Sequence, residues 1–124
     1  MAFFKRHEVT VTTDASGDGT SYTPTLNGFI QSIRYVKTDF ADGVDFVCSL
    51  EDSGVLVWDQ DNVNASATVY PRAPTADTAG VASLYAAAGE PVETRIPVAN
   101  ERLQIVVAAG GNTKTGVFHV VVGG

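Results

Sequence analysis

Apolar and polar residues alternate along most of this chain, and a two-residue period is the pattern of half-buried β-strands. Short runs rich in Gly, Asp, Asn and Ser interrupt the alternation and predict the turns between strands. The strand-like runs lie near residues 9–12, 28–37, 46–51, 55–60, 92–98, 103–107 and 117–122, with short pieces at 22–25 and 67–70. We therefore expect seven or eight antiparallel strands.

The phase of the alternation predicts which side chains face the core. Phe29, Ile33 and Tyr35 fall on one face of a single strand. Leu56 and Trp58 share a face of the strand that follows a tight Asp-Ser-Gly turn.

Frequent turns without a convincing amphipathic helix predict an all-β sandwich or barrel, and a jelly roll is the first choice. The length of 124 residues fits one domain, so we assign residues 1–124 to a single β-sandwich. The run 117–122 is apolar on both faces, which predicts either a central strand covered on both sides or an edge strand buried by a neighbour.

Residues 71–91 break this regularity. The stretch PRAPTADTAGVASLYAAAGEP is much longer than a usual connection of about 4–6 residues. Long loops in small domains either serve a function or are ordered by a partner. One interpretation is that its apolar residues cover the end of the core. The other is that they contact another molecule.

Charge and cysteine content narrow the function classes. The chain has 14 acidic and 8 basic residues, a net charge of −6, and its basic residues are scattered along the sequence. Binding to nucleic acid or to an anionic membrane is therefore disfavoured, because both require clustered Lys and Arg. With Cys48 as the one cysteine, no internal disulfide can form. No signal peptide or membrane-spanning run is visible, so we expect a cytoplasm-like compartment unless the protein leaves it within an assembly.

No catalytic constellation is apparent, so the chain is expected not to be an enzyme. His7 and His119 lie in predicted strands. Cys48 alternates in phase with Phe46 and Leu50, so we predict that its side chain is buried and unreactive.

Asp39, Asp42 and Asp45 surround a glycine, a density of oxygen ligands that calcium would accept. The pattern lacks the alternate acids and closing glutamate of an EF-hand. A turn is the better explanation, and we expect neither a metal nor a cofactor.

Aromatic residues raise the alternative of a carbohydrate-binding module. Trp58, Tyr70 and Tyr85 are the side chains that would stack on sugars. Because Trp58 is in phase with Leu56, core packing is the better interpretation for it.

Four segments together resemble small virion proteins of tailed bacteriophages: GFIQSIRYVKTDFADGVDF, EDSGVLVW, ATVYPRAP and IPVANERLQIVVAAGGNTKTGVFHVVV. In that group a G-x-I-x-x-I-x-Y strand precedes D-x-x-x-G-x-D-F, a Y-P-R opens a long loop, and a V-A-x-x-R-L/I-x-V-x-V strand comes near the end. The matching residues are Gly28, Ile30, Ile33, Tyr35, Asp39, Gly43, Asp45, Phe46, Tyr70, Pro71, Arg72, Val98, Ala99, Arg102, Leu103, Ile105 and Val107.

The resemblance implies a structural role in the virion. It points first to a non-enzymatic capsid decoration or cement subunit that stabilises the head shell, and second to a tail or neck subunit. The implied partners are the major capsid protein or other virion subunits. A homo-oligomer, trimer or dimer, is the natural expectation. The implied location is the virion, after synthesis in the host cytoplasm.

The expected contact residues lie in two segments. Phe3 and Phe4 belong to a predicted N-terminal contact arm, residues 1–8, because aromatic residues at a fraying terminus need a partner to cover them. Arg72 and Tyr85 lie in the long loop and have the side chains enriched at protein interfaces.

Overall fold

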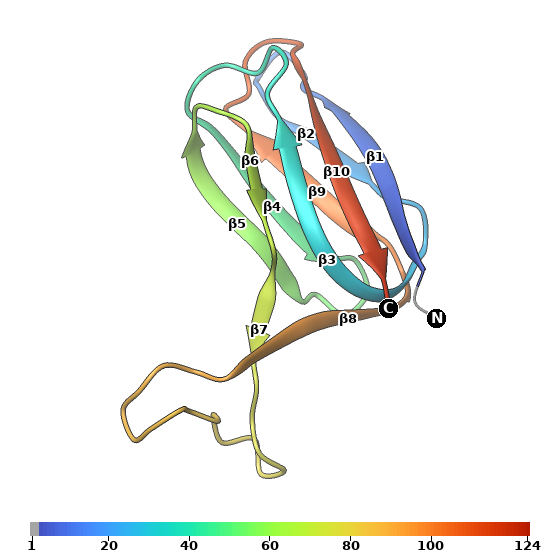
Figure 1. The fold of residues 1–124 in the computed structure, drawn as a ribbon. Coiled ribbons are helices and arrows are strands. Elements are labelled where there is room, and N and C mark those ends of the chain that lie inside the picture. Colours follow the sequence, from blue (N-terminus) through green and yellow to red (C-terminus); the bar gives the residue numbers. More distant parts are fainter. Residues whose placement is uncertain (1–2) are drawn as a thin grey trace.

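The computed structural model describes residues 3–124, and all the regular secondary structure there is β (Figure 1). Met1 and Ala2 of the predicted arm lie outside the described residues. The described part of the chain contains no helix able to cross a membrane. The strands are β1 (Phe4–Thr12), β2 (Gly19–Tyr22), β3 (Leu26–Val36), β4 (Val44–Leu50), β5 (Leu56–Val63), β6 (Ala67–Val69), β7 (Arg72–Pro74), β8 (Glu93–Glu101), β9 (Leu103–Ala108) and β10 (Thr115–Gly123).

The strands form two antiparallel sheets that pack face to face as a jelly roll (Figure 1). One sheet has the order β1-β10-β3-β8-β7, with β6 also paired to β3, and the other has the order β2-β9-β4-β5. The pairs are nested along the sequence, since β1 pairs with β10, β2 with β9, β3 with β8, and β4 with β5. This is the topology of one long hairpin rolled over itself, and it confirms the predicted all-β sandwich, although the described residues form ten strands and not seven or eight. Because β10 lies between β1 and β3, residues 117–122 form an inner strand and not an edge strand.

Aromatic rings occupy the middle of the core between the sheets. Tyr35 of β3 lies 5.2 Å from Phe46 of β4 and 5.3 Å from Phe118 of β10, measured between ring centroids. Trp58 meets Phe46 edge-on at 4.7 Å. These contacts join both sheets. The other buried apolar residues are Val9, Val11, Leu26, Ile30, Ile33, Phe40, Val44, Cys48, Leu50, Val63, Ile96, Val98, Leu103, Ile105, Val107, Val120 and Val122.

Two β-bulges change the predicted faces. Opposite β10, Ser32 pairs with Val121 and Ile30 pairs with Val122, so Gln31 is an extra residue in β3. Ile30 is therefore fully buried, whereas Phe29, predicted to face the core, is only half-buried. A second bulge at Val57 turns Leu56 outward, where it is 56% exposed. Both predictions were wrong because an inserted residue reverses the phase of the alternation.

The N-terminal arm is also corrected for its described residues. The first strand begins at Phe4, five residues before Val9, and pairs with β10 from Phe4↔Gly123 onwards. Residues 4–8 are therefore an edge strand of the sheet. The strand piece predicted at 22–25 lies earlier, at Gly19–Tyr22, because Pro24 cannot donate to a strand ladder.

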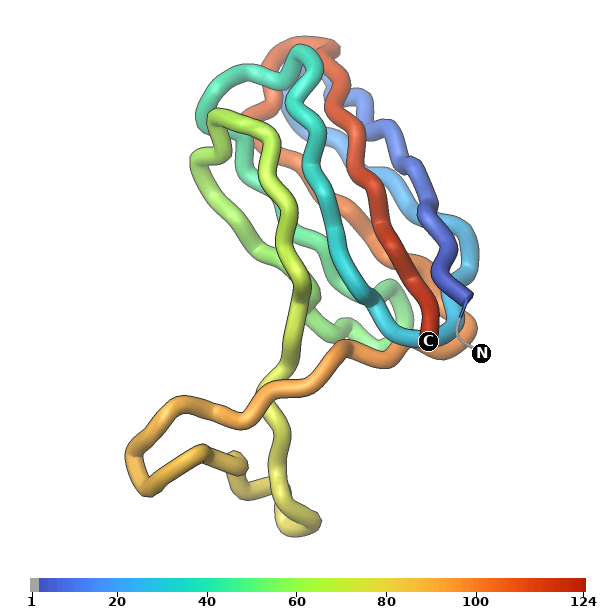
Figure 2. The backbone as a smooth tube through the Cα atoms, in the orientation of Figure 1, coloured from blue at the N-terminus to red at the C-terminus, as the bar shows by residue number. Residues whose placement is uncertain are grey.

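The long loop is a projecting hairpin. We call residues 72–95 the arm hairpin. Its root is the pairing of β7 with the start of β8, and isolated bridges join Ala76 to Ala82 and Leu84 to Pro91. It extends away from one end of the sandwich, the end at which both termini lie (Figures 1 and 2). The arm hairpin therefore does not cover the core, and that interpretation of residues 71–91 was wrong.

Candidate interaction surfaces

The arm hairpin presents apolar side chains that its own fold does not bury. Tyr85 is 76% exposed, and Val81 and Leu84 are also exposed. Backbone hydrogen bonds nevertheless order the segment: the Tyr85 N–H donates to the Glu90 carbonyl at 3.0 Å, and the Val92 N–H donates to the Ser83 carbonyl at 2.9 Å. An ordered segment with exposed apolar side chains is suited to contact with another molecule.

The other predicted contact residues lie at the same end of the molecule. Phe3 and Phe4 are exposed beside the last residues of β10. Leu56, whose side chain the bulge turns outward, follows the β4–β5 turn at this end (Figure 1). The apolar surface is therefore concentrated where the arm hairpin projects.

Arg72 lies at the root of the arm hairpin. Its Nη1 donates to the carbonyl of Pro71 at 2.9 Å, and its strand partner is another arginine, Arg95. The Arg95 guanidinium lies 4.5 Å from the centroid of the Phe29 ring, a cation–π distance. In residues 3–124 no ion pair joins Arg72 to an acidic residue. The structure brings Arg72 together with Arg95, at the root, whereas Tyr85 lies further out on the hairpin.

At the opposite end of the sandwich, the carboxylates in and beside the turns already accept hydrogen bonds from the chain itself. Asp14 Oδ1 accepts from the Ser16 and Asp18 amides, and Asp45 Oδ1 accepts from the Asn62 amide. Asp39 accepts from the Thr115 amide and hydroxyl.

These hydrogen bonds also bear on whether Asp39, Asp42 and Asp45 could bind calcium. The backbone hydrogen bond from Thr115 is the largest cause of a lowered pKa at Asp39. Asp42 forms an ion pair with Lys37. No group of three candidate ligands comes together within the described residues. Each of Asp39, Asp42 and Asp45 thus has a structural role in or beside a turn, and the absence of metal stays a prediction.

The residues considered for catalysis are apart. Cys48 is fully buried on β4, and burial raises the pKa of its thiol to about 12. His7 and His119 lie on β1 and β10 of the other sheet. Burial, and then the charge of Lys5, lower the pKa of His7. A thiol with so high a pKa is a poor nucleophile at neutral pH.

The aromatic residues divide into buried and exposed groups. Trp58 is only 7% exposed, which confirms its place in the core and removes it as a sugar-stacking residue. Tyr70 is 68% exposed, and Tyr85 is exposed on the arm hairpin.

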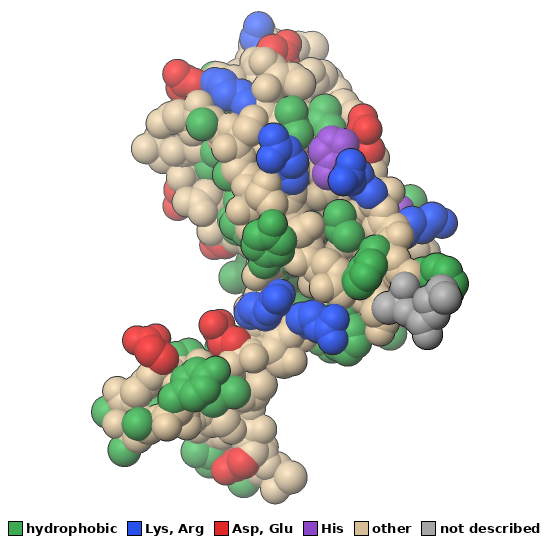
Figure 3. Space-filling view, in the orientation of Figure 1, with side chains coloured by type: hydrophobic (Ala, Val, Ile, Leu, Met, Phe, Trp, Pro, Cys, Tyr) green, Lys and Arg blue, Asp and Glu red, His purple; other side chains and the backbone are tan. Residues whose placement is uncertain are grey.

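Arginines that are far apart in the sequence lie on one face of the folded protein. Because Val9, Ile33 and Ile96 point into the core, Arg6, Arg34 and Arg95 point outward from the six-stranded sheet. Figure 3 shows Lys and Arg side chains over this face, with acidic ones mainly at its margins and on the arm hairpin. The sequence missed this face because neighbouring strands here are distant in sequence. The order β1-β10-β3-β8-β7 could not be read from the alternation.

Comparisons with known proteins do not identify a family for this chain. No protein-family model and no curated protein matches the chain. A solved structure, the crystal structure of FLHE, aligns with 97% of this chain and 96% of that chain, at 11% sequence identity and a TM-score of 0.41. A likeness at this level carries no argument about function.

Proposed function

We propose that this protein is a non-enzymatic structural subunit of a tailed-phage virion, a decoration or cement protein that binds the major capsid protein through its arm hairpin. The observation that carries the proposal is the arm hairpin itself. It is ordered, projects from the sandwich, and exposes Val81, Leu84 and Tyr85, and beyond its root at Ala73 none of its apolar side chains packs against the core. An ordered and exposed apolar segment of this kind is suited to contact with a partner.

The asymmetry between the two ends of the molecule supports the proposal. Exposed Phe3, Phe4 and Leu56 accompany the arm hairpin at one end. At the other end, turns such as Asp14–Asp18 satisfy their own polar groups. A partner that covers the apolar end removes that surface from water, at about 25 cal/mol per Å². If the protein is instead a neck or tail subunit, the same end would be its contact surface. Contacts between copies in a dimer or trimer would enlarge that surface.

The test measures binding to phage heads purified without the protein. We expect the double variant Arg72→Ala/Tyr85→Ala to bind at least about tenfold more weakly, because truncating interface aromatics and arginines costs more than 1 kcal/mol at hot spots. The melting temperature should be unchanged, since both side chains lie outside the core. Co-sedimentation with heads gives the affinity, and calorimetry gives the melting temperature.

Val106→Ala is the matched control, because Val106 is an exposed apolar residue on β9 of the other sheet. It should bind heads as the unaltered protein does. Full binding by the double variant, or a fall in melting temperature with intact binding, contradicts the proposal. Binding to glycans instead of heads would favour the carbohydrate-binding alternative through Tyr70 or Tyr85.

A further inference from the structure

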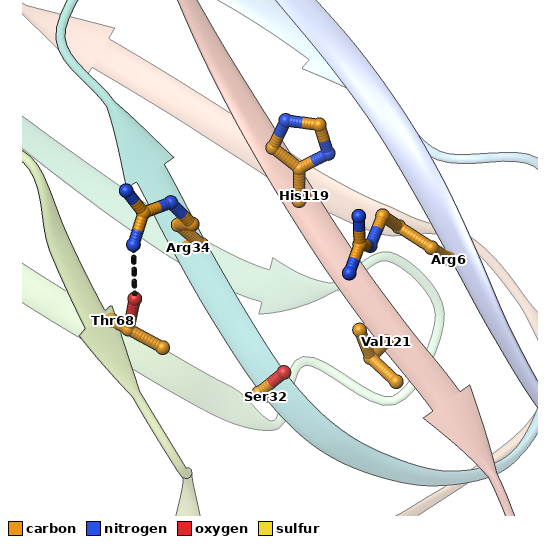
Figure 4. A pocket seen from close by; sticks show the side chains of 6 residues that line it. All are labelled: Arg6, Ser32, Arg34, Thr68, His119 and Val121. Carbon is orange, nitrogen blue, oxygen red and sulfur yellow. Dashed lines mark hydrogen bonds between the residues drawn. The ribbon is translucent and has the colours of Figure 1, made fainter.

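The outer face of the six-stranded sheet contains a hollow of about 320 Å³. It is bordered by side chains from β1, β3, β6 and β10, and none of its lining residues belongs to the arm hairpin (Figure 4). The lining residues are Arg6, Ser32, Arg34, Thr68, His119 and Val121.

Strand pairing explains why these side chains meet. Arg34 of β3 has His119 and Thr68 as its cross-strand partners. Val121 is paired with Arg6 on one side and Ser32 on the other. Figure 4 shows Arg34 and Thr68 on one side of the hollow, His119 above it, and the Arg6 guanidinium reaching over β10 from the other side. Ser32 and Val121 lie below.

The hollow carries positive charge that no carboxylate neutralises by direct contact. In the part of the chain that the structure describes, the ion pairs are Lys37–Asp42 and Arg102–Glu51, so Arg6 and Arg34 belong to neither. The Arg34 Nη1 donates instead to the neutral Thr68 hydroxyl at 3.1 Å. The nearest acid on this face by strand register is Glu8, the cross-strand partner of His119.

The hydroxyl of Thr68 adds a donor to this lining, whereas Nδ1 of His119 does not. Thr68 accepts from Arg34, and a hydroxyl that accepts keeps its own hydrogen available to donate. The Nδ1 atom of His119 is buried and has no hydrogen-bond partner within residues 3–124. Because this nitrogen is enclosed, the donors that a ligand in the hollow can reach are the guanidinium and hydroxyl groups.

We propose that this hollow is an oxyanion-binding site that takes a phosphate or sulfate group. Two guanidinium groups and two hydroxyls lie on several sides of the hollow, which suits the diverging oxygens of a tetrahedral anion. A lone carboxylate presents two coplanar oxygens, which a single arginine can satisfy with its paired N–H groups. The number and spread of the donors therefore favour phosphate or sulfate over a carboxylate.

The site does not depend on the proposed function. Its lining residues are outside the arm hairpin, so the variants that test docking to phage heads leave the hollow intact. Failure of one proposal leaves the other standing.

The test titrates the full chain with inorganic phosphate, inorganic sulfate and glycerol 3-phosphate, against sodium chloride at equal ionic strength. A ligand that binds only the folded state stabilises it, and at ten times the dissociation constant we expect a rise in melting temperature of about 5 °C. Amide chemical shifts of Ser32, Thr68 and His119 should move in the same titration. Tighter binding of glycerol 3-phosphate assigns the site to a phosphate ester, and tighter binding of an inorganic anion assigns it to a free oxyanion.

Arg6→Ala and Arg34→Ala should each weaken oxyanion binding at least about tenfold, as expected for loss of a charge-assisted hydrogen bond. Both residues are exposed, so the variants should fold. Arg72→Ala is the matched control, since Arg72 lies on the same face but outside the hollow. Equal losses in all three variants, or a response no larger than that to chloride, would mean diffuse attraction and overturn the site.

Discussion

At the scale of single residues, Tyr35 has the most unusual position. Its ring is fully buried at the centre of the aromatic core, and its hydroxyl has no hydrogen-bond partner within the described residues. Burial is the main reason that the pKa of Tyr35 is raised, and the charge of Asp42 adds to it. The ring therefore stabilises the core by packing against Phe46 and Phe118, whereas the hydroxyl carries an uncompensated cost of desolvation.

Tyr35→Phe should consequently leave the protein as stable or make it more stable, by about 1 kcal/mol, because it removes the buried hydroxyl and keeps the ring. Urea unfolding followed by tryptophan fluorescence measures the free energy. Tyr35→Leu is the comparison that removes the aromatic contacts, and it should lower stability. A clear loss in Tyr35→Phe would show that the hydroxyl has a partner, such as an ordered water.

At the scale of elements, the arm hairpin and β1 contribute differently to the fold. The arm hairpin beyond its root bonds mainly within itself, as the Thr75–Val92 and Ser83–Val92 backbone bonds show. In contrast, β1 pairs along its full length with β10 and buries Val9 and Val11. The first element is an extension of the sandwich, and the second is part of it.

Replacing residues 76–90 by a two-residue Asn-Gly turn should therefore change the melting temperature by less than about 3 °C, because surface segments away from the core contribute little. Calorimetry checks this directly. Deletion of residues 1–6 is the contrasting variant, since it removes the Phe4–Arg6 part of the ladder with β10, and it should lower the melting temperature. An unfolded product of the hairpin replacement would show that the arm hairpin supports the core.

The elements also show how far alternation predicts a fold. It located β4 and β9 correctly because neither strand is interrupted within its buried stretch, and Phe46, Cys48 and Ile105 face the core as expected. It failed at Phe29 and Leu56 because each bulge depends on the partner strand, which a local pattern does not contain. The arm hairpin was recognised as exceptional by length and composition, but its projection from the sandwich depends on where its root is paired.

At the scale of the whole molecule, the strand order creates surfaces that no segment shows by itself. Arg6, Arg34 and Arg95 come from distant parts of the sequence and share one face only because β1, β10, β3 and β8 are neighbours in the sheet. The sequence-based argument from scattered basic residues therefore loses its premise, although the absence of nucleic-acid binding stays a prediction. The four contact candidates were identifiable from residue type, but the hollow and its pairing of Arg34 with His119 were not.

The stability of the whole molecule in acid depends on carboxylates that accept hydrogen bonds between segments of the two sheets. Asp39, in the β3–β4 connection, accepts hydrogen bonds from Thr115 of the six-stranded sheet. Glu101, at the end of β8, accepts from the Ser53 and Asp52 amides of the β4–β5 turn, both at 2.9 Å. The backbone bond from Thr115 and that from Ser53 are the largest causes that lower the pKa values of Asp39 and Glu101 respectively.

A carboxyl whose pKa is lower in the folded state stabilises the fold when ionised, so the contribution is complete above the unfolded value and is lost as pH falls through the folded value. The ordinary values are 3.8 for Asp39 and 4.5 for Glu101, so the loss should begin below about pH 5 and continue below pH 4. Melting temperatures between pH 3 and pH 7 measure it. Asp39→Asn and Glu101→Gln should each be less stable at pH 7 and show a shallower decline with acid, whereas Asp59→Asn, at an exposed position on β5, should follow the unaltered protein. Parallel curves for all four proteins would show that these two carboxylates do not control the acid response.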